Sequence, residues 1–451
     1  MLVLKNGRIV DPSQQLDKVT NLYIENGKIA HIGDDFELDD DAKIVDVSGK
    51  IVSPGFIDIH MHEDYINDEG KLQDSISMSA LKMGVTLDVG GNCGDNNTDP
   101  LVLFDIADKG VPTNIALFVG HTTLRSSFGK ADKYKAIDAE KIKKITEKAD
   151  EYLQKGCIGV SFGVKYVPGT TWEEILPLIK LCHKYNKLVS SHVRQDVDGV
   201  FDSCAELAKM GKEGDVKVQF SHIGSMGGYG QMEELLKQIE GYRTEGIDMM
   251  CDCYPYTAFS TGIGETTYDD GFLDRYQADY DSVMIASGPY AGTRCDKELF
   301  EKIRKEEPHT MTVGYFMKAE DIEMALKSDL VMIGSDGTRG RDGKGHPRAS
   351  GSFARFIEEY INTGKIPLMD GIAKMSTMAA ERLGLDSKGS LKVGKDGDVT
   401  VFDLENTKDN ADYHNSLLAP SGIEYVIING EIALEHGEVV NAHLGRSVRK
   451  F

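Results

Sequence analysis

The chain has 451 residues, 40% of them hydrophobic and 27% charged, and a formal net charge of −22. This length suits one large domain with a smaller satellite, and the composition is typical of a folded globular protein. The acidic balance argues against nucleic-acid binding, which needs a basic surface, so we expect no nucleic-acid partner.

The N-terminus and the cysteines predict the compartment. No apolar run approaches the roughly 20 residues of a membrane span, so we expect no membrane partner. The N-terminal MLVLKNGRIVDPS lacks the features of a signal peptide. Seven cysteines are scattered along the chain, an odd number that does not suit a disulfide framework. We therefore expect a cytoplasmic protein in which the cysteines at 251 and 253, among others, pack in the core. The oligomeric state stays open.

Both ends of the chain predict short strands. LVLKNGRIVD, NLYIENGKIAHIG and KIVDVSGKIVSPG alternate apolar and polar residues around glycine-containing turns, which is typical of β-hairpins. The C-terminal region repeats this pattern in SLKVGKDGDVTVFDL and EYVIINGEIALEHGEVV. Because neither end can bury a face by itself, we expect residues 1–53 and 386–451 to form one small β-sandwich domain.

The region 54–385 predicts an α/β barrel. Apolar, β-rich runs alternate there with helix-period segments such as 139–156 and 172–186. Apolar strands alternating with helices indicate a parallel sheet, and eight such units indicate a closed (β/α)8, or TIM, barrel. The eight runs are 55–62, 84–91, 113–121, 157–164, 187–193, 216–223, 247–254 and 329–336. The stretch 261–328 is too long for one connection, so we expect an insertion with some strand near the mouth of the site.

Potential metal ligands stand at the C-terminal ends of these strands. His60 and His62 end the first run, His192 and His222 lie at the fifth and sixth, and Asp336 ends the eighth. Period 2 directs both imidazoles of the first run to one side, and TIM-barrel active sites form at this face. Imidazole and carboxylate are zinc ligands. The sequence therefore predicts a metal site at this rim.

Several blocks resemble the N-acyl-D-amino-acid deacylases of the amidohydrolase superfamily. SPGFIDIHMHED resembles the first metal motif of the superfamily, and GVTLDVGGNCG resembles a deacylase segment that contains a cysteine. Further matching blocks follow in order over roughly residues 1–440: FVGHTTLR, GVSFGVKYVPGTTWEEI, SSHVR, FSHI, CDCYPYTAFST, IGSDG and HPRASGSFARF. The resemblance implies a zinc-dependent hydrolase that cleaves N-acyl-D-amino acids to a carboxylate and a free D-amino acid.

The resemblance also implies how the metal is held. Cys93, His192 and His222 would bind one tight Zn²⁺ ion. His60 and His62 would help to form a second, weaker site. Zinc suits amide hydrolysis because it lowers the pKa of water towards ~7.

Further roles follow from the same resemblance. Asp336 would be a metal ligand and the general acid and base, and Tyr254 would polarise the scissile carbonyl. Arg348 would grip the carboxylate of an N-acyl amino acid substrate, since a planar guanidinium binds carboxylate bidentately. Ser260 and His346 would complete the substrate contacts.

One departure from the family bears on specificity. Where related sequences often carry a lysine two residues after His222, this chain has Gly224. A substrate with an acidic side chain would lose that partner. Glu265, Asp269 and Asp270 add negative charge in the expected insertion, which favours a neutral or basic side chain.

Two alternatives stay open. A cyclic amidase of the dihydroorotase or hydantoinase type uses the same barrel but bridges its metals with a carboxylated lysine, for which Lys165 after the fourth strand is the candidate. A non-catalytic scaffold with this fold is the second alternative, and it would bind no stoichiometric zinc. His121 and Arg125 match a family block, but the sequence assigns them no role. The acyl group, the side-chain preference and the number of metals are not determined.

Overall fold

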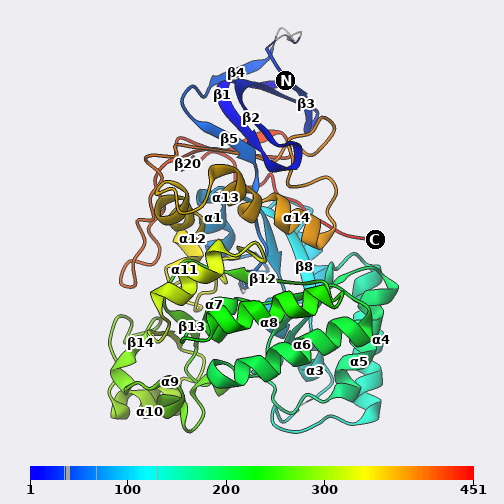
Figure 1. Ribbon diagram of the computed structural model, residues 1–451, viewed down its shortest axis with the longest axis vertical. Helices are drawn as coiled ribbons and strands as arrows, with labels where there is room; N and C mark the ends of the chain where they lie inside the picture. Colours follow the sequence, from blue (N-terminus) through cyan, green and yellow to red (C-terminus); the bar gives the residue numbers. More distant parts are fainter. Residues whose placement is uncertain (35, 37–40, 68, 130) are drawn as a thin grey trace.

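The computed structural model describes residues 1–34, 36, 41–67, 69–129 and 131–451. Its frame is a parallel sheet whose strands pair in the order β6-β7-β8-β9-β10-β11-β12-β16 (Figure 1). These strands are β6 (Phe56–Asp58), β7 (Val85–Gly90), β8 (Asn114–Gly120), β9 (Gly159–Gly163), β10 (Leu188–His192), β11 (Val218–Phe220), β12 (Met249–Cys253) and β16 (Val331–Ile333). Each lies within one of the eight predicted runs.

The first and last strands of this sheet approach each other just beyond their ends. The Asp336 amide donates to the His60 carbonyl at 2.7 Å, and the His62 amide donates to the Gly337 carbonyl at 2.9 Å. Met61 and Gly337 form a parallel bridge. The sheet is thus a nearly closed TIM barrel, as predicted, and its seam brings residues 60–62 beside Asp336.

Helices cover the barrel. α4 (Ala139–Gln154) begins at Asp138, whose carboxylate accepts the Lys141 amide at 2.8 Å, and such an N-cap satisfies a free helical donor. α4, α5, α6 and α8 lie side by side (Figure 1). The barrel region contains α1 (Ser75–Lys82), α2 (Pro100–Ala107), α3 (His121–Ser127), α5 (Trp172–Lys184), α6 (Val200–Gly214), α7 (Ile223–Gly227), α8 (Met232–Thr244), α11 (Ala319–Lys327), α12 (Arg348–Phe356), α13 (Leu368–Met375) and α14 (Thr377–Leu383). No helix among the described residues has the length and apolarity needed to cross a membrane.

Alternate positions of the barrel strands fill the barrel interior. Ile57, Leu87, Val89 and Phe118 pack in one buried cluster with Leu383 of α14. Strand residues of one parity share a face, and this cluster takes such residues from β6, β7, β8, β10 and β16. Much of the interior is therefore a packed core, and polar side chains within it, such as Gln219 and Asp252, bond to one another.

The two termini build a second sheet. It has nine strands in the order β20-β19-β18-β17-β5-β1-β2-β3, with β4 paired to β1. Its strands are β1 (Leu2–Asp11), β2 (Leu16–Glu25), β3 (Lys28–Ile32), β4 (Lys43–Asp46), β5 (Ile51–Pro54), β17 (Val399–Phe402), β18 (Ile423–Ile428), β19 (Glu431–Glu435) and β20 (Glu438–Val439). The N- and C-terminal strands join through β5 and β17, and side chains from both ends of the chain, among them Leu4 and Val401, share one buried cluster. The boundaries at 53/54 and 385/386 stay a prediction.

The connection between β12 and β16 contains a small sheet of its own. β13 (Phe259–Gly262), β15 (Met311–Gly314) and β14 (Val283–Ile285) pair antiparallel in the order β13-β15-β14. α9 (Phe272–Tyr276) and α10 (Lys297–Glu306) lie beside them (Figure 1). Because β13 begins soon after β12 ends, this segment lies close to the C-terminal rim of the barrel.

Candidate functional site

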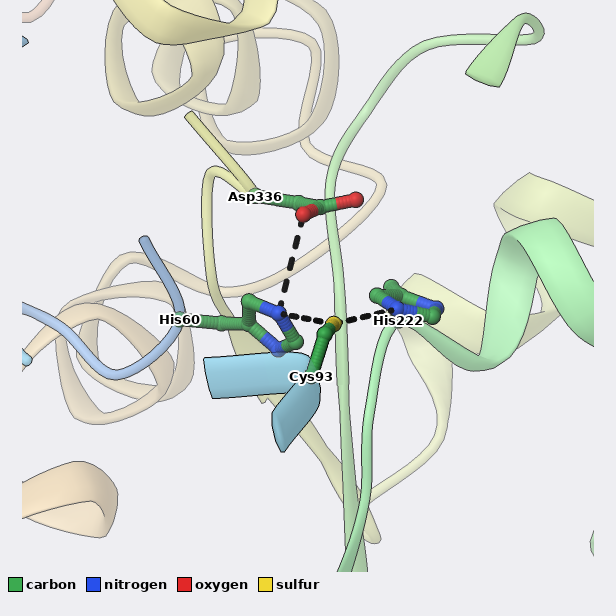
Figure 2. A group of neighbouring side chains, drawn as sticks. All are labelled: His60, Cys93, His222 and Asp336. Carbon is green, nitrogen blue, oxygen red and sulfur yellow. Dashed lines mark hydrogen bonds and ion pairs between the residues drawn. The ribbon is translucent and has the colours of Figure 1, made fainter. Parts of the chain in front are cut away.

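Four potential metal ligands from different strands meet at the C-terminal rim. The ligand atoms of His60, Cys93, His222 and Asp336 all lie within 4.8 Å of one another (Figure 2). Cys93 Sγ lies 3.3 Å from His60 Nε2 and 3.3 Å from His222 Nε2. His60 Nε2 lies 3.6 Å from Asp336 Oδ1. We call these four residues the ligand group.

Three members of the ligand group have a left-handed backbone. Cys93, His222 and Asp336 have φ values of 53°, 33° and 50°. This region is unfavourable for residues other than glycine, and such strain concentrates at functional sites. The turn that carries Cys93 needs glycine at 91, where φ is 75° and an added Cβ would lie 2.3 Å from the Phe118 carbonyl oxygen. The GGNCG block therefore places the thiol by a specific turn.

Buried polar groups orient the two imidazoles of the ligand group. His60 Nδ1 lies 2.9 Å from Asp252 Oδ1, and the same oxygen accepts the His222 amide at 2.8 Å. His222 Nδ1 lies 2.8 Å from the Ser225 hydroxyl. With Nδ1 engaged in each ring, Nε2 faces the thiol, which is how outer partners orient metal-binding histidines.

The ligand group stabilises negative charge. Burial acts to raise the pKa of Cys93, but the charges of His60 and His222 outweigh it and hold the thiol pKa well below its usual range. Burial also acts to raise the pKa of Asp336, which Arg348, His222 and His62 hold well below its usual range. A divalent cation binds the deprotonated forms of its ligands. A buried thiol and a buried carboxyl group that both favour their anionic forms are therefore suitable ligands for such an ion.

His192 and His62 flank the ligand group. The His192 ring lies 4.4 Å from the His222 ring between centroids, and neither of its nitrogens has a hydrogen-bond partner among the described residues. Burial and the charge of His222 lower the pKa of His192 to about 4, so this ring is in the neutral form that binds metal. His62 Nε2 lies 3.3 Å from Asp336 Oδ1. All six predicted ligands thus come together, whereas their division into a tight and a weaker site stays a prediction.

A pocket of about 500 Å³ opens onto this group. It is lined by His62, Cys93, His192, His222 and Asp336, and also by Ser260 and Arg348. Residues of β13 and the following segment, among them Thr261, Glu265 and Thr267, form part of the wall. A concave site with convergent polar groups beside candidate ligands is the expected form of an active site.

Arg348 lies between Asp336 and the pocket wall. Its Nη1 is 2.8 Å from Asp336 Oδ2, and its Nη2 donates to the Ser260 carbonyl at 3.3 Å. Behind it, His346 is fully buried, with Nε2 3.0 Å from the Ala258 carbonyl and Nδ1 accepting the Arg348 amide at 2.9 Å. His346 does not line the pocket, so its geometry supports positioning of Arg348, and its substrate contact stays a prediction.

Tyr254 is fully buried and is not among the residues that line the pocket. The Arg348 guanidinium carbon lies 4.6 Å from the centre of its ring, and its hydroxyl has no hydrogen-bond partner within the described part of the chain. Burial raises its pKa well above the usual value for tyrosine, so the phenol remains a donor. Ser260 lines the pocket, and its hydroxyl likewise has no described partner. The role of Tyr254 in polarising the scissile carbonyl and the contact of Ser260 with the substrate stay predictions.

Sequence reasoning missed two residues. Asp252 lies between the two cysteines of β12. Because side chains alternate along a strand, cysteines that pack in the core imply that Asp252 points to the opposite face. The sequence therefore contained a signal for Asp252. Tyr166 lines the pocket with its ring 4.6 Å from that of His192. It follows β9 by three residues, and no spacing rule indicates where a side chain after a strand points.

Lys165 does not belong to the ligand group. Its ammonium lies 2.8 Å from Asp196 Oδ2 in a buried ion pair on the pocket wall. A carboxylated lysine bridging two metals would instead lie among the ligands. This placement favours Cys93 over Lys165 as the residue that completes the metal site.

His121 and Arg125 bind a buried carboxylate. His121 Nε2 lies 2.7 Å and Arg125 Nε lies 2.8 Å from Glu174 Oε1, and all three side chains are almost fully buried. His121 and Arg125 belong to α3, and Glu174 lies in the first turn of α5. This contact gives the two residues a structural role that joins neighbouring helices.

Replacing Glu174 by glutamine is expected to lower the free energy of unfolding by about 3–5 kcal/mol, because it leaves the buried Arg125 charge uncompensated. Chemical denaturation followed by circular dichroism measures the change. The matched control is Glu140→Gln, which removes an exposed pair with Lys144 and is expected to cost under about 0.5 kcal/mol. Equal effects of the two substitutions would contradict the assignment.

Known proteins share this fold and much of this sequence. Residues 274–434 match the Amidohydrolase family. A D-aminoacylase from Alcaligenes xylosoxydans xylosoxydans is 30% identical, over 99% of this chain and 96% of its own length. A crystal structure of a D-aminoacylase superposes with a TM-score of 0.87 at 26% identity, covering 99% of both chains. The N-acyl-D-glutamate deacylase of Bordetella bronchiseptica, solved with zinc and a phosphonate inhibitor, superposes with a TM-score of 0.83 at 26% identity, again over 99% of both chains. The chain therefore belongs to the D-aminoacylase family of amidohydrolases.

Proposed function

We propose that this protein is a zinc-dependent deacylase that hydrolyses the amide bond of N-acyl-D-amino acids, releasing a carboxylate and the free D-amino acid. The observation that carries the proposal is the ligand group, a thiol, two imidazoles and a carboxylate on the wall of a pocket that also contains Arg348. The related deacylases supply the reaction class and the D configuration.

Zinc is the metal that this donor set suits, since thiolate, imidazole and carboxylate are its usual ligands. Cys93 and His222 would hold it, with His192 and His60 adjacent, and His62 beside Asp336 offers donors for a second ion. When bound, such an ion supplies Lewis acidity, which polarises an amide carbonyl and lowers the pKa of water. Its identity and number are part of the proposal.

The chain's own residues move the protons. Asp336 is ionised because Arg348 and the neighbouring histidines lower its pKa, so its carboxylate accepts a proton from the attacking water. It then returns that proton to the leaving amine nitrogen, which must be protonated before it departs. Tyr254 keeps its proton and donates a hydrogen bond to the carbonyl oxygen as negative charge develops there.

Arg348 orients the substrate. Its buried guanidinium lies between Asp336 and the Ser260 carbonyl, and it presents two parallel donors to the α-carboxylate. Ser260, whose hydroxyl is free among the described side chains, contributes a further hydrogen bond. Holding the α-carboxylate at one point places the scissile amide against the ligand group and lets the pocket distinguish the two enantiomers.

A hydrolysis screen with zinc supplied tests this function. N-acetyl- and N-formyl-D-amino acids are expected to exceed their L enantiomers in kcat/KM by at least about 100-fold. Chelation of the metal is expected to lower turnover by at least about 100-fold, and zinc is expected to restore it. Cleavage of hydantoin or dihydroorotate without deacylation would establish the cyclic amidase instead. Purification without stoichiometric metal and without turnover would establish a scaffold.

The cysteines support a cytoplasmic location, which we include in the proposal. All seven are described, and each is buried and unpaired. Unpaired buried thiols are typical of reducing compartments, where disulfides rarely persist.

A further inference from the structure

A second charged cluster lies on the wall of the pocket, outside the ligand group. The Lys165 ammonium lies 2.8 Å from Asp196 Oδ2, and Arg275 Nε lies 3.1 Å from Asp196 Oδ1. The Tyr276 hydroxyl also donates to Asp196 Oδ2. Lys165 and Asp196 are 7% and 3% exposed, yet both line the pocket. No step of the proposed reaction uses these residues.

The cluster has an excess of positive charge. Lys165 and Arg275 share one carboxylate, so the three groups carry a net charge of +1. Asp196 accepts a hydrogen bond from Tyr276 and lies within ion-pair distance of Lys165 and Arg275. The Lys165 ammonium has three donors, and Asp196 is its one ion-pair partner among the described residues. A buried ammonium with free donors is costly unless an acceptor reaches it, and at this wall the acceptor comes from the pocket.

Arg275 differs from Lys165 in its surroundings. Its side chain is 30% exposed, and its Nη2 donates to the Thr267 carbonyl. Part of Arg275 therefore faces solvent, although its Nε has no hydrogen-bond partner among the described residues. Of the two cations, Lys165 is the one that is buried and lines the pocket.

We propose that Lys165 is a specificity-determining residue that receives a second carboxylate of the substrate, carried either by the amino-acid side chain or by the acyl group. The inference rests on the proposed function, in which Arg348 holds the α-carboxylate. The enzyme then favours N-acyl-D-amino acids with two negative charges over their neutral analogues.

This placement changes the expectation drawn from Gly224. A Cβ at 224 would lie 2.7 Å from Ile322 Cδ1 and 2.9 Å from Cys253 Sγ, so a lysine there would require these buried side chains to move. Lys165, after β9, brings a positive charge to the same pocket from a different strand.

The acidic residues of the insertion bring less negative charge to the pocket than the sequence predicts. Asp269 pairs with Arg304 at 2.9 Å, and Asp270 is exposed. Glu265 does line the pocket, and burial favours the neutral form of both groups, raising the pKa of Glu265 and lowering that of Lys165. Lys165, however, has the Asp196 carboxylate 2.8 Å away to stabilise its charge. Lys165 therefore outweighs the acidic residues of the insertion.

Pairs of acid and isosteric amide substrates test the proposal. N-acetyl-D-glutamate against N-acetyl-D-glutamine probes the side chain, and N-succinyl-D-leucine against its terminal amide probes the acyl group. In at least one pair, the acid-to-amide ratio of kcat/KM is expected to be about tenfold or more, because a matched buried donor discriminates strongly. In Lys165→Met this ratio is expected to fall about tenfold, mainly through KM, while kcat/KM for the amide changes less than about threefold.

Three further variants distinguish a role of Lys165 in substrate specificity from a merely structural role of the charged cluster. Lys133→Met, at another lysine of the pocket, is the matched control and leaves the ratio unchanged. Asp196→Asn releases Lys165 from its partner and maintains or raises the ratio, whereas a merely structural cluster would lose activity towards acid and amide alike. Glu265→Gln, with N-acetyl-D-lysine as the substrate, tests the alternative that Glu265 gives the pocket a preference for a basic side chain.

Specific outcomes overturn the inference. They are a ratio near or below one for both wild-type pairs, an unchanged ratio in Lys165→Met, or a preference for N-acetyl-D-lysine that Glu265→Gln removes. If the amide substrates are hydrolysed, the proposed function stands whatever the ratio. If no N-acyl-D-amino acid is hydrolysed, the proposed function fails and this inference fails with it.

Discussion

Replacing Asp336 by asparagine is expected to lower kcat for an N-acyl-D-amino acid by at least about 10³-fold while the metal stays bound. Asparagine keeps the shape of the side chain and an oxygen ligand, but its amide cannot take a proton from water or return one to the leaving amine. Cys93, His60 and His222 remain to hold the ion. Elemental analysis of the purified variant and steady-state kinetics with zinc supplied measure the two quantities.

The Asp336 substitution has a matched control on the same strand. Asp329 is exposed just before β16, at the opposite end from the pocket, and Asp329→Asn is expected to leave both kcat and metal content unchanged. Activity of Asp336→Asn within tenfold of wild type would remove Asp336 from the proton-transfer role. Loss of the metal together with activity would show that Asp336 acts mainly as a ligand.

The barrel could be predicted because each strand carries its own signal. Val85–Gly90 and Asn114–Gly120 are buried along their whole length, and that burial on both faces produces the continuous apolar runs seen in the sequence. The same regularity places His192 and His222 at strand ends. Fold and ligand types thus follow from local pattern and the rule that barrel sites lie at one face.

The details of the site depend on contacts that local pattern does not contain. The Asp252 carboxylate approaches His60, a residue far away in the chain, and this contact exists only once the barrel closes. The φ of 33° at His222 lies in a region that few residues other than glycine adopt, so the tertiary contacts around His222 must stabilise it. By sequence, Lys165 is a candidate for a metal bridge, and only the structure shows that it forms an ion pair with Asp196 instead.

In the terminal sheet, too, the local pattern predicts the strands but not all of their contacts. Alternation predicted its strands, and packing of the two ends on one core was expected. The pairing of β17 with β5, Val399 opposite Pro54 and Phe402 opposite Ile51, joins the ends into one sheet. Strand partners far apart in sequence are chosen by global topology, which alternation alone does not encode.

Replacing Cys93 by alanine is expected to remove the metal and to lower kcat/KM by at least about 10³-fold, because the remaining imidazoles lose the anionic ligand between them. In the folded protein Sγ lies 3.3 Å from Nε2 of both His60 and His222, so no other described side chain can take its place without a change in the turn. Cys93→Ser is expected to bind zinc weakly, since a hydroxyl loses its proton far less readily than a thiol whose pKa the neighbouring imidazoles lower. Cys182→Ala, at a buried cysteine of α5, controls for the loss of a packed thiol and should retain metal and activity. Stoichiometric zinc in Cys93→Ala would show that the thiol only packs at the rim, and the reaction would then need a metal site built from histidine and Asp336 alone.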